Sequence, residues 1–228
     1  MKTRNLLAIF TALVIGAARL EPACAQIWIQ TSAPSNNWVS IAVSADGTQI
    51  VAVAGGSRAG PIYTSSDYGA AWVSNNIAPQ LWADVASSAD GTKLVAAAYG
   101  GQIYTSTDSG GHWTPRASND YWQSLASSAD GSRLVAVPDS GQIYTSTDSG
   151  VTWTPQESSR YWQGVASSAD GTKLAASVYN GQLYTSTTTT TVGTEGSLTG
   201  DQFAALELLY IGGGQWLPLS YVGTMTPY

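Results

Sequence analysis

A repeat of 40 residues runs through the middle of this chain and constrains its fold more than any other feature. Trp82, Trp122 and Trp162 are spaced 40 residues apart, and Trp38 precedes Trp82 by 44 residues. Each tryptophan is followed by Ser-Ala-Asp-Gly and then by Ile/Leu-Tyr-Thr-Ser. A fixed period of this length indicates one recurring supersecondary unit, which buries its apolar face only against its neighbours.

Within one unit, the pattern predicts four short strands joined by tight turns. In the unit at 122–161, strand-forming stretches are separated by Asp130-Gly131, Ser140-Gly141 and Asp148-Ser-Gly150. We expect Asp-Gly to form a two-residue hairpin turn with both central residues at positive φ. Helical periodicity is absent from the repeats. The sequence therefore predicts an all-β protein, a β-propeller of four-stranded antiparallel blades; a parallel β-helix is the alternative.

The third turn of each unit carries the most specific motif. Ser-x-Asp-x-Gly-x-x-Trp occurs three times in register, beginning at Ser65, Ser106 and Ser146. This motif resembles the Asp-box, or BNR, repeat of bladed proteins such as bacterial sialidases and sortilin-type receptors. The whole run resembles exported bacterial proteins built from BNR-type repeats. The resemblance implies a structural role at the blade periphery, which suits an Asp that accepts backbone bonds, a Gly at positive φ and a buried Trp. The motif residues are Asp67, Gly69, Trp72, Asp108, Gly110, Trp113, Asp148, Gly150 and Trp153.

The chain divides into three parts. Residues 1–25 have a basic start, an apolar run and Ala23-Cys24-Ala25, which predict a signal peptide cleaved after Ala25 and a secreted or periplasmic protein. Lipidation of Cys24 is the alternative. Residues 26–192 carry the propeller repeats, and residues 193–228 are expected to form a C-terminal closing segment that contains a hairpin. A helix over residues 201–210 is the alternative there. The units lie near residues 38–81, 82–121, 122–161 and 162–186.

The segment Gln26–Ser32 has the features of an isolated fourth strand. Its Trp28 lies ten residues before Trp38, much as Trp113 and Trp153 precede the tryptophan of the next unit. We expect this N-terminal strand to close the last of about five blades and so to remove an exposed sheet edge. The sequence leaves three alternatives open: a shortened member of a family with more blades, an incomplete ring, and a chain that pairs with another copy of itself.

Composition argues against several kinds of partner and cofactor. The formal net charge is −6, with nine basic residues in the chain, whereas nucleic acids and anionic membranes require clustered Lys and Arg. The apolar run in the signal segment is too short for a membrane span, so we expect no membrane insertion after cleavage. A single Cys and a single His cannot form a His/Cys metal site. The Gly-Gly pairs are interpreted as hairpin turns rather than phosphate-binding loops, so no metal or cofactor is expected.

The predicted ligand-binding residues lie on the variable face of the propeller. The turns after the first and third strands hardly vary between units. The turns after the second strands and the connections between units do vary, and variation on a constant scaffold is typical of a binding surface. Aromatic rings beside amides and carboxylates suit sugar recognition. The candidates are Arg58, Tyr99, Asp120, Tyr121, Asp139, Arg160, Tyr161 and Tyr179.

The resemblance to sialidases raises the question of catalysis. It implies three convergent arginines, a Tyr–Glu pair and an acidic residue for proton transfer. After residue 25 the arginines are Arg58, Arg116, Arg133 and Arg160, and no glutamate lies beside a tyrosine in a recognisable motif. We therefore assign no catalytic residue and expect a non-catalytic binding or interaction module for a glycan or an extracellular protein. The alternatives are a sialidase-type glycoside hydrolase and an assembly factor that binds protein through an Arg-rich face.

Overall fold

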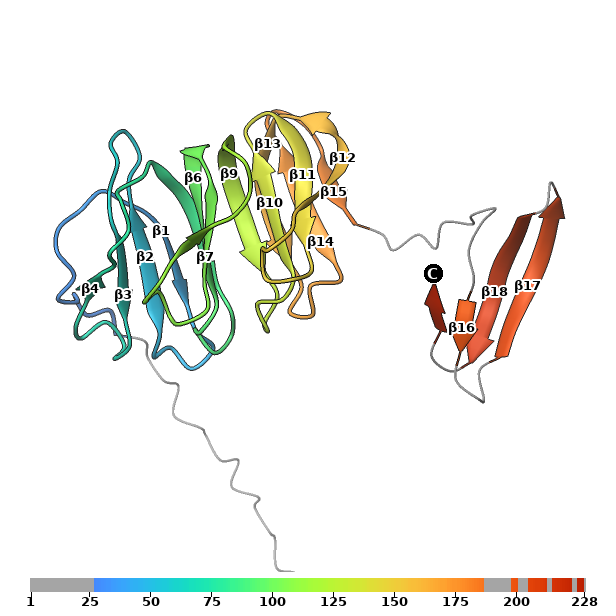
Figure 1. Cartoon of the computed structure of the whole chain (residues 1–228), viewed down its shortest axis with the longest axis horizontal. Coiled ribbons are helices and arrows are strands. Elements are labelled where there is room, and N and C mark those ends of the chain that lie inside the picture. The colour runs from blue at the N-terminus through green and yellow to red at the C-terminus, as the bar shows by residue number, and fades with distance from the viewer. Residues whose placement is uncertain (1–26, 187–197, 201–204, 213–214, 223–224, 228) are drawn as a thin grey trace, which may run out of the picture. The chain divides into compact units, whose positions relative to one another are not determined.

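The computed structural model describes residues 27–186, 198–200, 205–212, 215–222 and 225–227, and every regular element in them is a β-strand (Figure 1). Among the described residues, 27–31 belong to one unit and those from Ser32 onward to another. Between residues 38 and 185 the strands form successive antiparallel groups, which we call blades 1 to 4. The all-β, propeller-type fold predicted from the repeat is thus confirmed.

Blades 1 to 3 have four strands each, and blade 4 has three. Blade 1 contains β1 (Trp38–Val43), β2 (Ile50–Ala54), β3 (Ile62–Ser65) and β4 (Val73–Ser74). Blade 2 contains β5 (Trp82–Ser87), β6 (Leu94–Gly101), β7 (Ile103–Ser106) and β8 (Thr114–Pro115). Blade 3 contains β9 (Asp120–Ser127), β10 (Leu134–Pro138), β11 (Gly141–Ser146) and β12 (Thr154–Arg160). Blade 4 contains β13 (Trp162–Ser167), β14 (Leu174–Val178) and β15 (Leu183–Thr185).

The core lies between successive blades. Val53 and Ile62 of blade 1 pack in one buried cluster with Trp82 of blade 2. The equivalent Ile103 and Trp122 belong to the cluster between blades 2 and 3. The repeated tryptophan is therefore a core residue wherever another blade precedes it, and each such ring also meets the edge of a tyrosine of its own blade. Trp38, in the first blade, keeps 37% of its surface exposed.

The Ser-Ala-Asp-Gly turn differs from the two-residue hairpin that we predicted. In blade 1 the N–H of Gly47 donates to the carbonyl of Ser44 at 2.9 Å, and only Gly47 of the Asp-Gly pair has positive φ. The hydroxyl of Ser44 donates to Oδ1 of Asp46 and accepts from the N–H of Gln49. These side-chain bonds favour a four-residue turn that ends in a left-handed glycine. The two-residue prediction was therefore wrong.

The same turns connect the blades through a row of backbone hydrogen bonds. The N–H of Ala45 donates to the carbonyl of Ala89 at 2.7 Å, Ala89 donates to Ala129 at 2.6 Å, and Ala129 donates to Ala169 at 2.7 Å. All three bonds run in one direction, from each blade to the blade that follows it. We call this row the alanine ladder. It satisfies backbone groups that the turns would otherwise leave to water.

The described sheets are not closed into a ring. Residues 27–37 contain no strand, and the side chains of Ile27, Trp28 and Ile29 are exposed. The expected N-terminal closing strand is therefore not formed. In the C-terminal segment, β17 (Ala205–Gly212) and β18 (Gln215–Val222) form the predicted antiparallel hairpin rather than the alternative helix. β16 (Leu198–Gly200) pairs with β19 (Met225–Pro227) in a separate sheet. The predicted signal peptide lies outside the described residues.

Candidate functional site

Four tyrosines are exposed on the variable face: Tyr99, Tyr121, Tyr161 and Tyr179, with 40 to 63% of their surfaces accessible. They lie where the second strand of a blade ends and where the first strand of a blade begins. We call these four residues, with Asp120 and Asp139, the tyrosine face. Backbone bonds hold it in place: Tyr99 donates to Leu81, Asp139 to Tyr121 and Tyr179 to Tyr161, each at 2.7 Å.

Tyr99 and Tyr121 form the tightest pair on this face. Their ring centroids are 5.1 Å apart with the planes inclined at 55°. The contact arises because β6 extends past blade 2 and pairs with the start of β9, so that Tyr99 lies opposite Tyr121 and Gly101 opposite Asp120. The Asp120 carboxylate accepts the N–H of Tyr121 at 2.8 Å. Two residues that belong to different blades, Tyr99 to blade 2 and Tyr121 to blade 3, thus form one surface.

The two candidate arginines are in different surroundings. Arg58 is exposed in the turn between β2 and β3. Arg160, at the end of β12, is half-buried, and its guanidinium carbon lies 4.6 Å from the centre of the Tyr184 ring. Its Nε is buried and has no hydrogen-bond partner in the part of the chain that is described. Arg160 therefore contributes to packing between blades 3 and 4 through a cation–π contact.

The three Asp-box turns repeat one geometry. In blade 3 the Asp148 carboxylate accepts bonds from the Ser146 hydroxyl and from the N–H and hydroxyl of Thr152. These bonds favour the ionised carboxylate and lower the pKa of Asp148 to about 2, with the Thr152 hydroxyl as the largest cause. Gly150 has φ +84°, and Ser149 before it is also left-handed at +58°. The sequence motif indicated the left-handed glycine but not the left-handed residue that precedes it.

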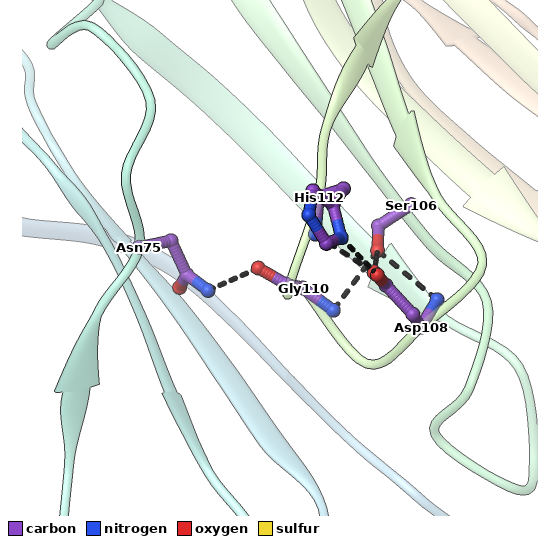
Figure 2. A network of polar contacts seen from close by, with 5 residues as sticks. All are labelled: Asn75, Ser106, Asp108, Gly110 and His112. Atoms are coloured by element: carbon purple, nitrogen blue, oxygen red, sulfur yellow. Dashed lines mark hydrogen bonds and ion pairs between the residues drawn. The ribbon is translucent and has the colours of Figure 1, made fainter.

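Figure 2 shows the box of blade 2 and its contact with blade 1. His112 Nδ1 lies 2.6 Å from Oδ2 of Asp108, and this bond is the largest cause that lowers the pKa of Asp108 to about 2. From blade 1, the side-chain amide of Asn75 donates to the carbonyl of Gly110. In the other two boxes the indole N–H of the motif Trp donates to the equivalent glycine carbonyl. The indole N–H of Trp113 instead has no partner among the described residues.

The box glycines of blades 2 and 3 also lie against the preceding blade. A Cβ added to Gly110 would lie 2.8 Å from Cγ2 of Thr64, and one added to Gly150 would lie 2.7 Å from Cγ2 of Thr105. Glycine is therefore required at these positions for two reasons, its left-handed backbone and the close approach of the preceding blade. The motif tryptophans Trp113 and Trp153 pack beside the corresponding inter-blade clusters.

A cleft of about 670 Å³ lies between blades 3 and 4. Thr145 and Gln156 of blade 3 and Leu174 and Tyr184 of blade 4 are among the residues that line it. Of these residues, Thr145 and Leu174 correspond, 40 residues on, to Thr105 and Leu134, which lie against Gly150 at the preceding interface. The sequence signal for this cleft is the loss of the Asp-box motif after Ser186, a loss that did not by itself predict an opening.

Asp84 is a polar residue of the inner strands that our sequence analysis missed. Its Oδ1 accepts the hydroxyl of Ser40 in blade 1 at 2.7 Å. Its Oδ2 accepts the hydroxyl of Ser124 and the N–H of Leu125 in blade 3, each at 3.0 Å. One carboxylate thus connects three blades. The signal was available, since the equivalent position of the other units holds Ser40, Ser124 and Gly164.

The described residues contain no group of three His, Cys, Asp or Glu side chains that could hold a metal ion. The turn carboxylates that have lowered pKa values are distributed over all four blades and bonded within their own turns. A search for a membrane-spanning helix in the same residues found none.

No family model and no curated protein matches this sequence. Among solved structures, a GH74 enzyme from Niastella koreensis is similar with a TM-score of 0.53 and 21% identity, over 68% of this chain and 24% of the enzyme. The computationally designed Ika4 protein is similar with a TM-score of 0.55 and 12% identity, over 71% of this chain and 97% of Ika4. A chain of a nidogen/laminin complex is similar with a TM-score of 0.51 and 11% identity, over 64% of this chain and 58% of that chain.

This chain therefore corresponds to about a quarter of the Niastella koreensis enzyme and to nearly all of Ika4. At such identities the similarity concerns the path of the backbone. Together with the blades described above, it identifies the chain as a protein of the β-propeller type of fold.

Proposed function

We propose that this chain is a non-catalytic binding module and that its ligand binds to the tyrosine face. The observation that carries the proposal is the set of four exposed tyrosines, held by backbone hydrogen bonds at the variable ends of blades 2 to 4. Tyrosine offers a rigid apolar ring with a polar tip, and it is over-represented in binding surfaces. Rings that are ordered before the ligand arrives lose little side-chain entropy on binding.

A glycan is the ligand class that this face suits best. The tilted Tyr99–Tyr121 pair presents two ring surfaces on which the C–H faces of a sugar can stack. Asp120 and Asp139 lie beside these rings and can accept hydrogen bonds from hydroxyl groups. The acidic chain, with its net charge of −6, favours a neutral or cationic polysaccharide over an anionic one.

The experiment applies the purified chain to an array of neutral, cationic and anionic glycans. Selective binding is expected, and Tyr121→Ala should weaken it at least tenfold because stacking area and the contact with Tyr99 are both lost. The matched control is Tyr68→Ala, which removes an equally exposed tyrosine from an Asp-box turn. Equal loss in both variants, or a blank array from folded protein, would contradict a glycan site on this face.

Two alternatives are separated by the same samples. If the ligand is an extracellular protein, the array should stay blank, and this chain should bind that protein in a way that Tyr121→Ala weakens. The nidogen/laminin complex among the fold neighbours is a reason to examine this outcome. A glycoside hydrolase would release reducing ends from a bound polysaccharide, and the GH74 enzymes among the fold neighbours are the reason to measure that. An Arg-rich assembly face is disfavoured because Arg160 stacks on Tyr184.

A further inference from the structure

The two ends of the row of blades expose surfaces that elsewhere in the same chain are buried. We call the surface that a blade turns toward the preceding blade its leading face, and the opposite surface its trailing face. On the leading face of blade 1, Ile41 is 65% exposed, whereas its equivalents Val85 and Leu125 are 4% and 5% exposed. On the trailing face of blade 4, Leu183 is 82% exposed, whereas the equivalent Ile62 is fully buried.

The leading face of blade 1 is also more apolar than the repeat requires. Val43 lies on the same side of β1 as Ile41, because side chains alternate along a strand. The other three units have serine at this position, and Val43 remains 56% exposed. An exposed apolar strip of this kind indicates a protein contact.

The alanine ladder gives that contact a direction. Each internal interface pairs the N–H of one turn alanine with the carbonyl of the next. At the ends of the row, the carbonyl of Ala45 and the N–H of Ala169 have no such partner among the described residues. The surface that complements the leading face of blade 1 is therefore a trailing face with a free alanine N–H, which is what blade 4 presents.

The cleft between blades 3 and 4 has a complementary occupant in the sequence. Thr145 and Leu174 line it where, one interface earlier, Thr105 and Leu134 contact Gly150 and the ring of Trp153 packs nearby. The segment Ile27–Ile29 carries Trp28, which is 93% exposed and lies ten residues before the first residue of β1, whereas Trp153 lies nine residues before the first residue of β13. An exposed apolar segment and a cleft at the position where an earlier interface holds a tryptophan thus occur in one chain.

We propose that a second copy of this chain binds head to tail. The leading face of its blade 1 packs on the trailing face of blade 4. Its segment from Ile27 to Thr31 adds to β15 as the fourth strand, and its Trp28 enters the cleft. Repetition of the contact at the other end gives a dimer of eight blades, which lies within the range of known propellers. This inference does not depend on the proposed function, because none of the surfaces involved belongs to the tyrosine face.

Disulfide trapping tests the pairing in the full chain with Cys24→Ser, which removes the native thiol. Ala45→Cys and Ala169→Cys are made separately and then mixed under mild oxidation. A cross-linked dimer is expected only in the mixture, because a ladder bond brings the two positions within disulfide reach. The control is the double variant Ala89→Cys/Ala129→Cys. Its two positions are joined by a ladder bond within one chain, so it shows whether such a pair can form a disulfide.

Several outcomes would overturn the proposal. Cross-linking of either single variant with itself would indicate a head-to-head or tail-to-tail contact. In the double variant Ala45→Cys/Ala169→Cys, a disulfide within one monomer would indicate that the chain closes on itself. Cross-linked trimers and larger oligomers of this variant would indicate an open polymer. Trp28→Ala should weaken dimerisation at least tenfold by light scattering at graded concentrations. An unchanged dimer would exclude the exchange of the N-terminal strand.

Discussion

At the scale of single residues, the glycines of the Asp-boxes combine two constraints that the motif alone does not separate. Gly69 and Gly150 share a φ of +84°. Of these two glycines, only Gly150 has a preceding blade among the described residues, and a Cβ there would lie 2.7 Å from Cγ2 of Thr105. The two glycines therefore distinguish the cost of backbone strain from the cost of crowding between blades.

Gly69→Ala should lower the free energy of unfolding by about 1–2 kcal/mol, the cost of a left-handed alanine. Gly150→Ala should lower it by about 1–3 kcal/mol more, because Thr105 and Leu134 must move aside. Urea denaturation of the two variants and the parent chain measures the difference. Equal losses would mean that the inter-blade approach contributes nothing at this position.

At the scale of elements, every blade carries a turn in which a carboxylate is held ionised. The pKa of Asp90 and of Asp170 is lowered to about 2, first by the serine hydroxyl that opens the turn and then by backbone N–H bonds. The pKa of Asp130 is lowered further by the equivalent bonds. A lowered pKa in the folded state means that unfolding takes up protons in acid, so these turns make stability depend on pH.

The Asp-box carboxylates Asp108 and Asp148 behave in the same way as these turn carboxylates. Their stabilisation is fully present above the unfolded pKa of 3.8 and is lost as pH falls through about 2. The free energy of unfolding should therefore fall steeply between about pH 4 and pH 2. A variant with Asp108→Asn and Asp148→Asn should be less stable than the parent at pH 7 and should fall less steeply in this interval. Urea unfolding at several pH values measures both slopes, and parallel curves would argue against the carboxylates as the source.

At the scale of the whole molecule, the blades form a row in which each contacts mainly its neighbours, so interior positions should matter more than terminal ones. Trp122→Ala should lower the free energy of unfolding by about 3–5 kcal/mol, since a fully buried ring leaves a cavity. Trp38→Ala should cost about half as much in dilute protein, because its ring is 37% exposed. Thermal and urea unfolding of both variants test this ranking, and equal losses would contradict it.

The sequence predicted the parts of the fold that repeat and missed those that depend on the ends. The period of Trp82, Trp122 and Trp162 was sufficient for the number and order of strands in each blade, because identical units require identical burial. It could not predict whether the row closes, since closure depends on curvature accumulated over several interfaces. It also missed the contact between Tyr99 and Tyr121, which arises from an extension of β6.

Asp84 has a consequence for how such a chain can change over time. Repeat proteins gain and lose units by recombination between similar segments. The units of blades 2 and 3 are similar enough in sequence for such recombination. The Asp84 carboxylate needs a serine on either side, Ser40 before it and Ser124 after it. A duplication of blade 2 would place two such carboxylates side by side, each without one of its serine donors. A duplication of blade 2 would therefore cost polar contacts that link the blades, although the blades share one fold.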